Sequence, residues 1–210
     1  MPENERLSGA TDWINLDFVE RERTPREVIE KSIRHHLAGT SLSNTVVLLE
    51  ELGVKRSRTA VHDWIQKAEL QPAGGARPDR VGVDQKAIRI NDDQYWLYAA
   101  VDPATNRMLH CRLFPTYTVP IVREFLTELA EKHDVSDAVF LVDDADDLIG
   151  GLRREGYSYR VQLHGERTQV ERVFREVQRR TSSFSNCFSH IDSPTAEPWL
   201  QAHAVWWNHA

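Results

Sequence analysis

Residues 80–114 have the sequence RVGVDQKAIRINDDQYWLYAAVDPATNRMLHCRLF, and this stretch decides the fold. It contains three runs rich in β-branched and aromatic residues, at 80–90, 95–101 and 107–114. Two short polar segments, NDD at 91–93 and PATN at 103–106, separate the runs and have the composition of turns. Such short connections predict three antiparallel strands that follow one another in a meander.

The chain downstream of this meander adds helices and two more strands. A helix is predicted over about 120–133, followed by the wholly apolar run 138–142, which is typical of a strand buried on both faces. A helix from about Asp146, a weak strand near 157–163 and two further helices complete the order. Three strands, helix, strand, helix, strand, helix is the order of an α/β ribonuclease H-like fold, which has a mixed five-stranded sheet with flanking helices.

The residues upstream predict short helices. Thr24 and Glu27 form a capping box, with Pro25 at the first helical position, so a helix should run to about residue 38. A second helix should begin at Ser41 or Ser43 and end before a glycine. The segment thus begins with two short helices joined by a glycine-containing turn.

A third helix, capped by Ser57, has an apolar stripe at i, i+3, i+4 and i+7, formed by Val61, Trp64, Ile65 and Ala68. Three such helices resemble an all-α helix-turn-helix module. In that geometry the third helix lies in the major groove of DNA and two preceding basic residues lie near phosphates. The residues concerned are Arg58, Thr59 and His62 on the helix, and Lys55 and Arg56 before it. A small helical bundle with solvated charges would have the same pattern, so the bundle stays open as an explanation.

These patterns predict three segments. Residues 1–71 would form the helix-turn-helix DNA-binding module, residues 72–79 a linker rich in Pro and Gly, and residues 80–210 the ribonuclease H-like domain. The net charge is −6, but the excess of acids is largest at 73–160, with 15 acidic and 11 basic residues. The negative total therefore does not exclude a nucleic-acid interface elsewhere on the chain.

Composition excludes several other classes of protein. No apolar run approaches the roughly 20 residues of a membrane span, and the first residues lack the features of a secretory signal. The two cysteines, Cys111 and Cys187, are too few and too far apart for a disulfide scaffold or a zinc ribbon. We therefore expect a cytoplasmic, nucleoid-associated protein that does not contact a membrane.

Two acidic residues stand where chemistry is common in such folds. Asp84 follows Val83 in the first strand, where a buried carboxylate without partners would be costly. Asp143 directly follows the apolar strand 138–142, and open α/β sheets place ligands at the carboxyl ends of their strands. Asp84 could instead face solvent, and Asp143 could cap a helix. The capping role fits three neighbouring acids well, namely Asp144, Asp146 and Asp147.

A third acid, Glu171, borders the apolar stripe of a predicted helix. At about 100° per residue, Glu171 lies about 60° from Phe174, which belongs to that stripe. Three basic residues flank its other side and would suit a DNA backbone, namely Arg172, Arg175 and Arg179. A solvated helix with mixed charges is an equally simple explanation. Carboxylates that converge from three elements would suit a pair of hard cations and phosphoryl transfer.

The ordered segments VDQ (83–85), YWLYAAVD (95–102), LVDDA (141–145) and VERVFREVQRR (170–180) resemble the DDE transposases of small prokaryotic insertion sequences. The most similar group is the compact integrase-like, cointegrate-forming family, especially its haloarchaeal members, and the resemblance covers nearly the whole chain. It implies that Asp84, Asp143 and Glu171 are the catalytic triad and hold two Mg²⁺ ions, which Mn²⁺ can replace. It also implies a homodimer or higher homo-oligomer that acts on double-stranded DNA, both element ends and target. His164 would then position the nucleophile or a phosphate.

The sequence departs from the family at three points. Thr168 stands where the family usually has Asn, and the segment HGER at 164–167, next to it, stands where the family often has a more amide-rich stretch. In addition, the second and third acids are 28 positions apart, a shorter spacing than is common. A catalytically decayed transposase that binds DNA without cutting it would also fit these departures. The sequence is compatible, too, with a helix-turn-helix transcription regulator or with a ribonuclease H-like nuclease that cuts without joining.

Overall fold

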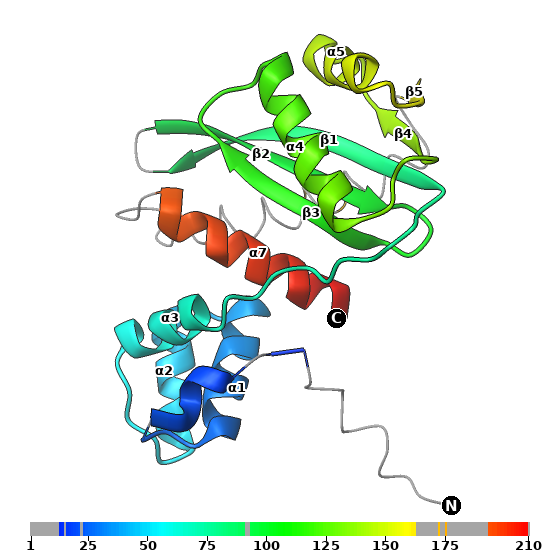
Figure 1. The fold of residues 1–210 in the computed structure, drawn as a ribbon. Helices are drawn as coiled ribbons and strands as arrows, with labels where there is room; N and C mark the ends of the chain where they lie inside the picture. Colours follow the sequence, from blue (N-terminus) through cyan, green and yellow to red (C-terminus); the bar gives the residue numbers. More distant parts are fainter. Residues whose placement is uncertain are drawn as a thin grey trace, which may run out of the picture. The chain divides into compact units, whose positions relative to one another are not determined.

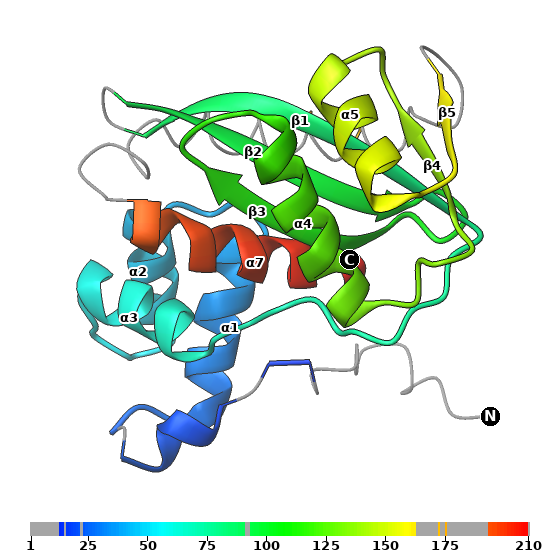
Figure 2. The same ribbon diagram turned by 45° about the horizontal axis from the view of Figure 1, so that its top comes forward.

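The computed structural model describes residues 13, 14, 16–21, 23–90, 93–162, 172, 175 and 193–209. By its internal contacts the chain divides into two compact units, residues 1–70 and 71–210. Figures 1 and 2 show the helices and strands of each unit. Within the described ranges, no helix combines the length and the apolar composition of a membrane span.

The first unit contains three short helices after a 3-10 turn: η1 (Asp17–Arg21), α1 (Arg26–Leu37), α2 (Leu42–Glu51) and α3 (Arg58–Lys67). Two predicted caps are confirmed, since Ser41 Oγ accepts a hydrogen bond from Asn44 N and Ser57 Oγ accepts one from Ala60 N, both at 3.1 Å. The helices share a core whose largest members are Ile29, Ile33, Leu37, Leu49, Val61, Trp64 and Ile65.

The start of α1 differs from the prediction. The capping box of Thr24 and Glu27 is wrong, because Pro25 occupies the N-cap position and no side chain caps the helix. Thr24 is buried, and its Oγ1 accepts a hydrogen bond from Arg56 Nε at 2.6 Å. A bond to a residue 32 positions away therefore replaces the predicted local cap.

The second unit is built on a mixed five-stranded sheet, with strand order β3-β2-β1-β4-β5. The strands are β1 (Arg80–Ile90), β2 (Asp93–Asp102), β3 (Arg107–Phe114), β4 (Val139–Val142) and β5 (Tyr159–Val161). Strands β1 to β3 form the antiparallel meander, β4 pairs parallel to β1, and β5 pairs parallel to β4. The predicted ribonuclease H-like sheet is confirmed, with β1 at its centre.

Helices cover both faces of this sheet (Figures 1 and 2). Helices α4 (Val119–Lys132) and α5 (Asp146–Glu155) pack on one face, which we call the α4/α5 face. Helix α7 (Ser193–His209) packs on the other, the α7 face. Strand β2 shows why both faces are covered, since Tyr98 is buried on the α4/α5 face and Leu97 on the α7 face.

Helices α4 and α5 approach each other closely at two glycines. A Cβ on Gly151 would overlap the buried Val122 side chain of α4, and a Cβ on Gly150 would lie 2.9 Å from Val119 Cγ2. The absence of side chains at these positions lets α5 pack against α4 as well as against the sheet. The first turn of α5 is thereby held close to the end of β4.

The segment predicted as a linker lies against the end of α4. It has no helix or strand over residues 71–78, but Gly75 N donates a hydrogen bond to Lys132 O at 2.7 Å. A side chain at Gly74 would place its Cβ only 2.8 Å from the same oxygen. The two glycines therefore allow the backbone to approach the helix closely.

Buried His133 joins this segment to the sheet. Its Nδ1 accepts a hydrogen bond from Ala76 N at 3.1 Å, and its Nε2 lies 3.0 Å from Leu109 O. Both bonds are made only by the neutral ring with its proton on Nε2. Burial lowers the pKa of His133, so the folded protein favours this neutral form.

His110 on β3 is neutral for similar reasons. It is buried and stacks on Phe125, its Nε2 lies 2.8 Å from Glu128 Oε2, and Lys132 Nζ lies 3.2 Å from its Nδ1. Burial lowers its pKa to about 3, and the charges of Lys132 and Arg112 act in the same direction. The Glu128 carboxylate opposes this shift, but Glu128 also pairs with Arg112 at 3.1 Å, so burial decides the state of the ring.

These two rings predict a loss of stability in mild acid. The unfolded rings have pKa values near 6.5 and bind protons that the folded rings do not, so their stabilisation is complete above that pH and declines below it. We expect the free energy of unfolding to fall between about pH 6.5 and 4.5 by up to about 1.4 kcal/mol per pH unit for His110, with a contribution of the same sign from His133. Urea titrations of the protein at several pH values measure this slope. His110→Gln should reduce it, whereas His35→Gln, at an exposed position, should not; equal slopes in all three proteins would contradict the assignment.

Candidate active site

Of the three predicted acids, Asp84 lies in β1 and Asp143 directly follows β4, the parallel neighbour of β1. Strands β1 and β4 pair in a regular parallel register, from Arg80 with Val139 to Gly82 with Leu141. Asp84 and Asp143 each stand two residues beyond that last pair. Neighbouring strands are about 4.8 Å apart, so this register places the two backbones side by side at the carboxyl end of β4. Although the two acids are 59 positions apart in sequence, Asp84 lies in β1 and Asp143 directly follows the neighbouring strand β4.

The alternation of side chains assigns both acids to one face. Val83 and Val142 belong to the core of the α4/α5 face. Because successive side chains of a strand point to opposite faces, Asp84 belongs to the α7 face, and continuation of the alternation by one residue assigns Asp143 to the same face. Asp84 is only 9% exposed, so it is not a solvent-facing residue. Asp143 is partly buried.

A backbone N–H orients each of the two carboxylates. Gln85 N donates to Asp84 Oδ1 at 2.8 Å, and Ala145 N donates to Asp143 Oδ1 at 3.1 Å. The second bond is a local turn between β4 and α5, whose N-cap is Ala145. The charged form of a carboxylate accepts such bonds, so the backbone helps to fix the direction of both side chains.

On the α4/α5 face of the sheet, another carboxylate, that of Asp147, forms a polar network. Gln85 Nε2 donates to Asp147 Oδ1 at 3.2 Å, and the Tyr98 hydroxyl donates to Asp147 Oδ2 at 3.3 Å. Tyr98 is fully buried, and burial together with the nearby Asp147 carboxylate raises the pKa of its hydroxyl. We call these three residues the Asp147 network. It connects β1, β2 and the first turn of α5.

This network is not among the features predicted from the sequence. Asp147 was predicted to fit a capping role, but the N-cap of α5 is Ala145 and makes no side-chain hydrogen bond. One signal was present, because Gln85 continues the alternation of Val81 and Val83 and therefore points toward the α4/α5 core. A polar residue at such a position requires a hydrogen-bonding partner.

The rest of the predicted catalytic helix is described at only two positions. Arg172 and Arg175 are helical and exposed. Glu171, Arg179, His164 and Thr168 lie outside the described residues. Among those that the structure does describe, no group of three or more His, Cys, Asp or Glu side chains is arranged to hold a metal ion. Of the predicted triad, the structure therefore describes Asp84 and Asp143 and not Glu171.

The two described acids fit a Mg²⁺ site in their chemistry. Mg²⁺ prefers oxygen ligands and is commonly held by one or two carboxylates together with substrate phosphates. Asp84, which is buried in β1, and Asp143, which directly follows β4, supply such oxygens. These two residues would therefore hold a divalent cation.

The predicted DNA-contacting residues of the first unit lie on one side of α3. At 100° per residue, the positions of Arg58, His62 and Thr59 span about 100° of the helix, beside the stripe of core residues Val61, Trp64 and Ile65. Arg58 and Thr59 are exposed and His62 is half-buried. We call Arg58, Thr59 and His62 the α3 face. Of the preceding basic residues, Lys55 is exposed, whereas Arg56 is partly buried and bonded to Thr24.

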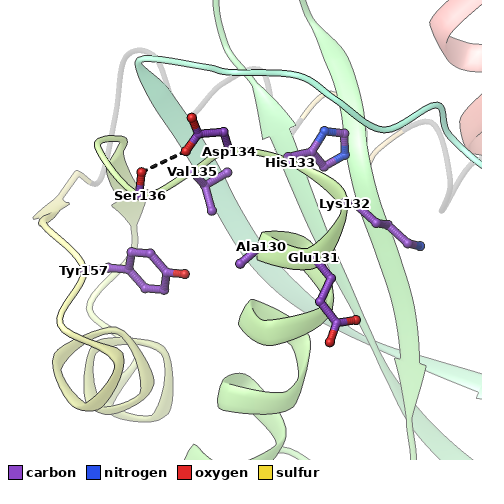
Figure 3. Close-up of a pocket in the computed structure, with 8 residues that line it drawn as sticks. All are labelled: Ala130, Glu131, Lys132, His133, Asp134, Val135, Ser136 and Tyr157. Carbon is purple, nitrogen blue, oxygen red and sulfur yellow. Dashed lines mark hydrogen bonds between the residues drawn. The ribbon is translucent and has the colours of Figure 1, made fainter.

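A pocket of about 370 Å³ lies at the opposite end of the parallel strands (Figure 3). Its lining comes from the end of α4, the residues before β4, and Tyr157 before β5. The side chains of Glu131 and Asp134 are acidic, and Asp134 accepts a hydrogen bond from Ser136 Oγ at 2.8 Å. Because the pocket precedes β4 whereas Asp143 follows it, the pocket is not part of the candidate site.

No protein-family model matches this chain, and no curated protein matches it. Three similar solved structures are of viral integrases. The catalytic core domain of BIV integrase has 13% identity and a TM-score of 0.45, and the match covers 60% of this chain and 82% of that chain. The HTLV-2 integrase catalytic core domain in complex with magnesium has 10% identity and a TM-score of 0.44, with 61% and 84% covered. A simian T-cell lymphotropic virus intasome in complex with PP2A regulatory subunit B56 gamma has 10% identity and a TM-score of 0.42, with 83% and 66% covered.

Proposed function

We propose that this protein is a DDE transposase that catalyses metal-dependent cleavage and strand transfer of DNA at insertion-sequence ends. The observation that carries the proposal is the parallel register of β1 and β4, in which Asp84 and Asp143 each follow the last pair, Gly82 with Leu141, by two residues. A buried carboxylate in β1 and a partly buried one directly after β4 supply the oxygen ligands of a cation site. A regulator with a sensing domain does not require such ligands. The resemblance of the sequence segments to DDE transposases supplies the specific reaction.

In this proposal Asp84 and Asp143 hold Mg²⁺ or Mn²⁺, and Glu171 supplies the third carboxylate. Bound divalent cations lower the pKa of a water and stabilise charge on the phosphodiester in the transition state. The chain itself contributes the direction of the carboxylates, through Gln85 N and Ala145 N, and the exclusion of water around Asp84. The exposed Arg172 and Arg175 would contact DNA phosphates, with Arg179 as a third contact.

The first unit would bind the element ends as a helix-turn-helix module. Its α3 face presents one positive charge and two groups able to form hydrogen bonds, while Lys55 lies in the loop just before the helix. The partner is therefore double-stranded DNA, both element ends and target. Because two ends must be joined to one target, a homodimer or higher homo-oligomer is the expected active form.

A joining assay tests the proposal. Purified protein would be incubated with Mg²⁺, labelled duplexes taken from the DNA on either side of the coding sequence, and a target plasmid. We expect labelled strands to become covalently joined to the plasmid, and EDTA to abolish the product. Hydrolysis without joining would indicate the nuclease. Sequence-specific binding without any cleavage in Mg²⁺ or Mn²⁺ would indicate a regulator or a decayed transposase, and would contradict the proposal.

A further inference from the structure

The Asp147 network and the two candidate ligands share one residue. The backbone N–H of Gln85 donates to Asp84 Oδ1, and the side chain of the same residue donates to Asp147 Oδ1. Gln85 therefore touches a candidate ligand on the α7 face and the network on the α4/α5 face. Gln85 and Asp147, which this side-chain hydrogen bond joins, are 62 positions apart in sequence.

A second connection leads from Asp147 to the other ligand. Asp147 lies in the first turn of α5, two residues after Ala145, whose N–H donates to Asp143 Oδ1. Because α5 is a regular helix, a bond that fixes Asp147 also fixes the turn before it. The buried Tyr98 hydroxyl supplies the second such bond from β2.

The bond to Asp147 fixes the orientation of the Gln85 side-chain amide. The Asp147 carboxylate only accepts hydrogen bonds when ionised, so the Nε2 end of the Gln85 amide must face it. Gln85 Oε1 is then buried, without a hydrogen-bond partner in the part of the chain that the structure describes. An unpartnered buried oxygen is costly, and it persists here because the bond to Asp147 sets the direction of the amide.

We propose that the Asp147 network positions the two candidate metal ligands, with Asp147 as the shared acceptor that holds the Asp143 turn against the strand of Asp84. The inference rests on the proposed function, and it assigns to Gln85, Tyr98 and Asp147 a positioning role in the same site. Metal ligands must be held within about 0.5 Å of their productive geometry, and groups that orient them affect affinity strongly. The network is suited to that task because it spans three elements of the unit.

The direct measurement is the binding of Mn²⁺ to the full chain in the absence of DNA. The electron paramagnetic resonance signal of free Mn²⁺ reports how much of the ion remains unbound. Tyr98→Phe removes one hydroxyl and keeps the ring, and Gln85→Met removes the side-chain donor and keeps the backbone N–H to Asp84. We expect each to raise the Mn²⁺ concentration for half-saturation by about tenfold, the lower end of the roughly 10–100-fold range for groups that orient metal ligands.

A double-mutant comparison separates positioning from general destabilisation. Both donors act through Asp147, so in the Asp147→Ala background neither Tyr98→Phe nor Gln85→Met should change the half-saturating Mn²⁺ concentration by more than about twofold. Tyr157→Phe is the matched control, since Tyr157 packs on the same core but lies at the opposite end of the sheet. It should leave Mn²⁺ binding unchanged, and thermal unfolding of each variant shows whether the fold is retained.

Two outcomes would overturn the inference, and they differ from each other. If Asp84→Asn weakens Mn²⁺ binding while Tyr98→Phe and Gln85→Met stay within twofold of the parent, the network is structural only and the proposed function stands. If Asp84→Asn and Asp143→Asn also leave Mn²⁺ binding unchanged, the acids do not form a metal site, and the inference fails together with the proposed function. Because Gln85 is only partly buried, its variant keeps the test valid should Tyr98→Phe fail to fold.

Discussion

Asp143→Asn is expected to reduce the rate of strand joining by at least about a thousandfold, which corresponds to about 4 kcal/mol of transition-state stabilisation. The amide has nearly the same size as the carboxylate, and its oxygen can still accept the hydrogen bond from Ala145 N, so the turn before α5 should be kept. The change removes the negative charge that a divalent cation requires. Single-turnover joining rates with Mg²⁺ and a pre-cleaved end measure the chemical step.

The matched control for this change is Asp144→Asn. Asp144 is the next residue, carries the same charge and is exposed. Its substitution should leave the rate within about a factor of two, since exposed surface charges contribute little. Asp84→Asn should be as damaging as Asp143→Asn, because the two side chains share one face of adjacent strands. Joining at the parental rate by Asp143→Asn would remove that residue from the mechanism.

The meander and the position of Asp143 were predictable because they depend on local patterns. Runs rich in β-branched and aromatic residues, separated by short polar turns, predicted β1 to β3, and the structure confirms β1 and β3 at the predicted bounds. Strand β2 begins two residues before the prediction, at Asp93, because the backbone of this polar residue pairs with Ile90 across the hairpin. Backbone pairing extends a strand beyond its apolar residues, and no local pattern shows this.

Features that depend on contacts between distant residues were not predictable in the same way. Thr24 has the composition of an N-cap, but its hydroxyl accepts a bond from Arg56 instead. Asp147 likewise fits a helix start, and it accepts hydrogen bonds from β1 and β2. In both cases the side chain does not cap the nearby helix, although capping contributes about 1 kcal/mol. It accepts hydrogen bonds from residues distant in sequence, which are available only in the folded chain.

The α3 face gives the second large prediction, which concerns DNA binding rather than chemistry. Arg58→Ala should weaken binding to the element end by about ten- to a hundredfold and relax the preference for one base pair, because an Arg bonded to a base edge contributes about 1–3 kcal/mol of discrimination. Lys55→Ala should weaken binding to all sequences alike and reduce the slope of log K against log salt by about 1. Fluorescence anisotropy in EDTA measures binding without cleavage, so this test is independent of the metal site.

Arg26→Ala is the matched control, because Arg26 is an exposed arginine of the same unit that belongs to α1 and not to the α3 face. Arg56→Ala is a poor substitute, since loss of its bond to Thr24 would lower stability as well as remove a charge. If Arg58→Ala and Lys55→Ala bind element ends as tightly and as selectively as the parent, the first unit is a helical bundle whose charges are simply solvated. Recognition of the ends would then fall to the second unit, where the exposed Arg172 and Arg175 are the described cations of the predicted catalytic helix.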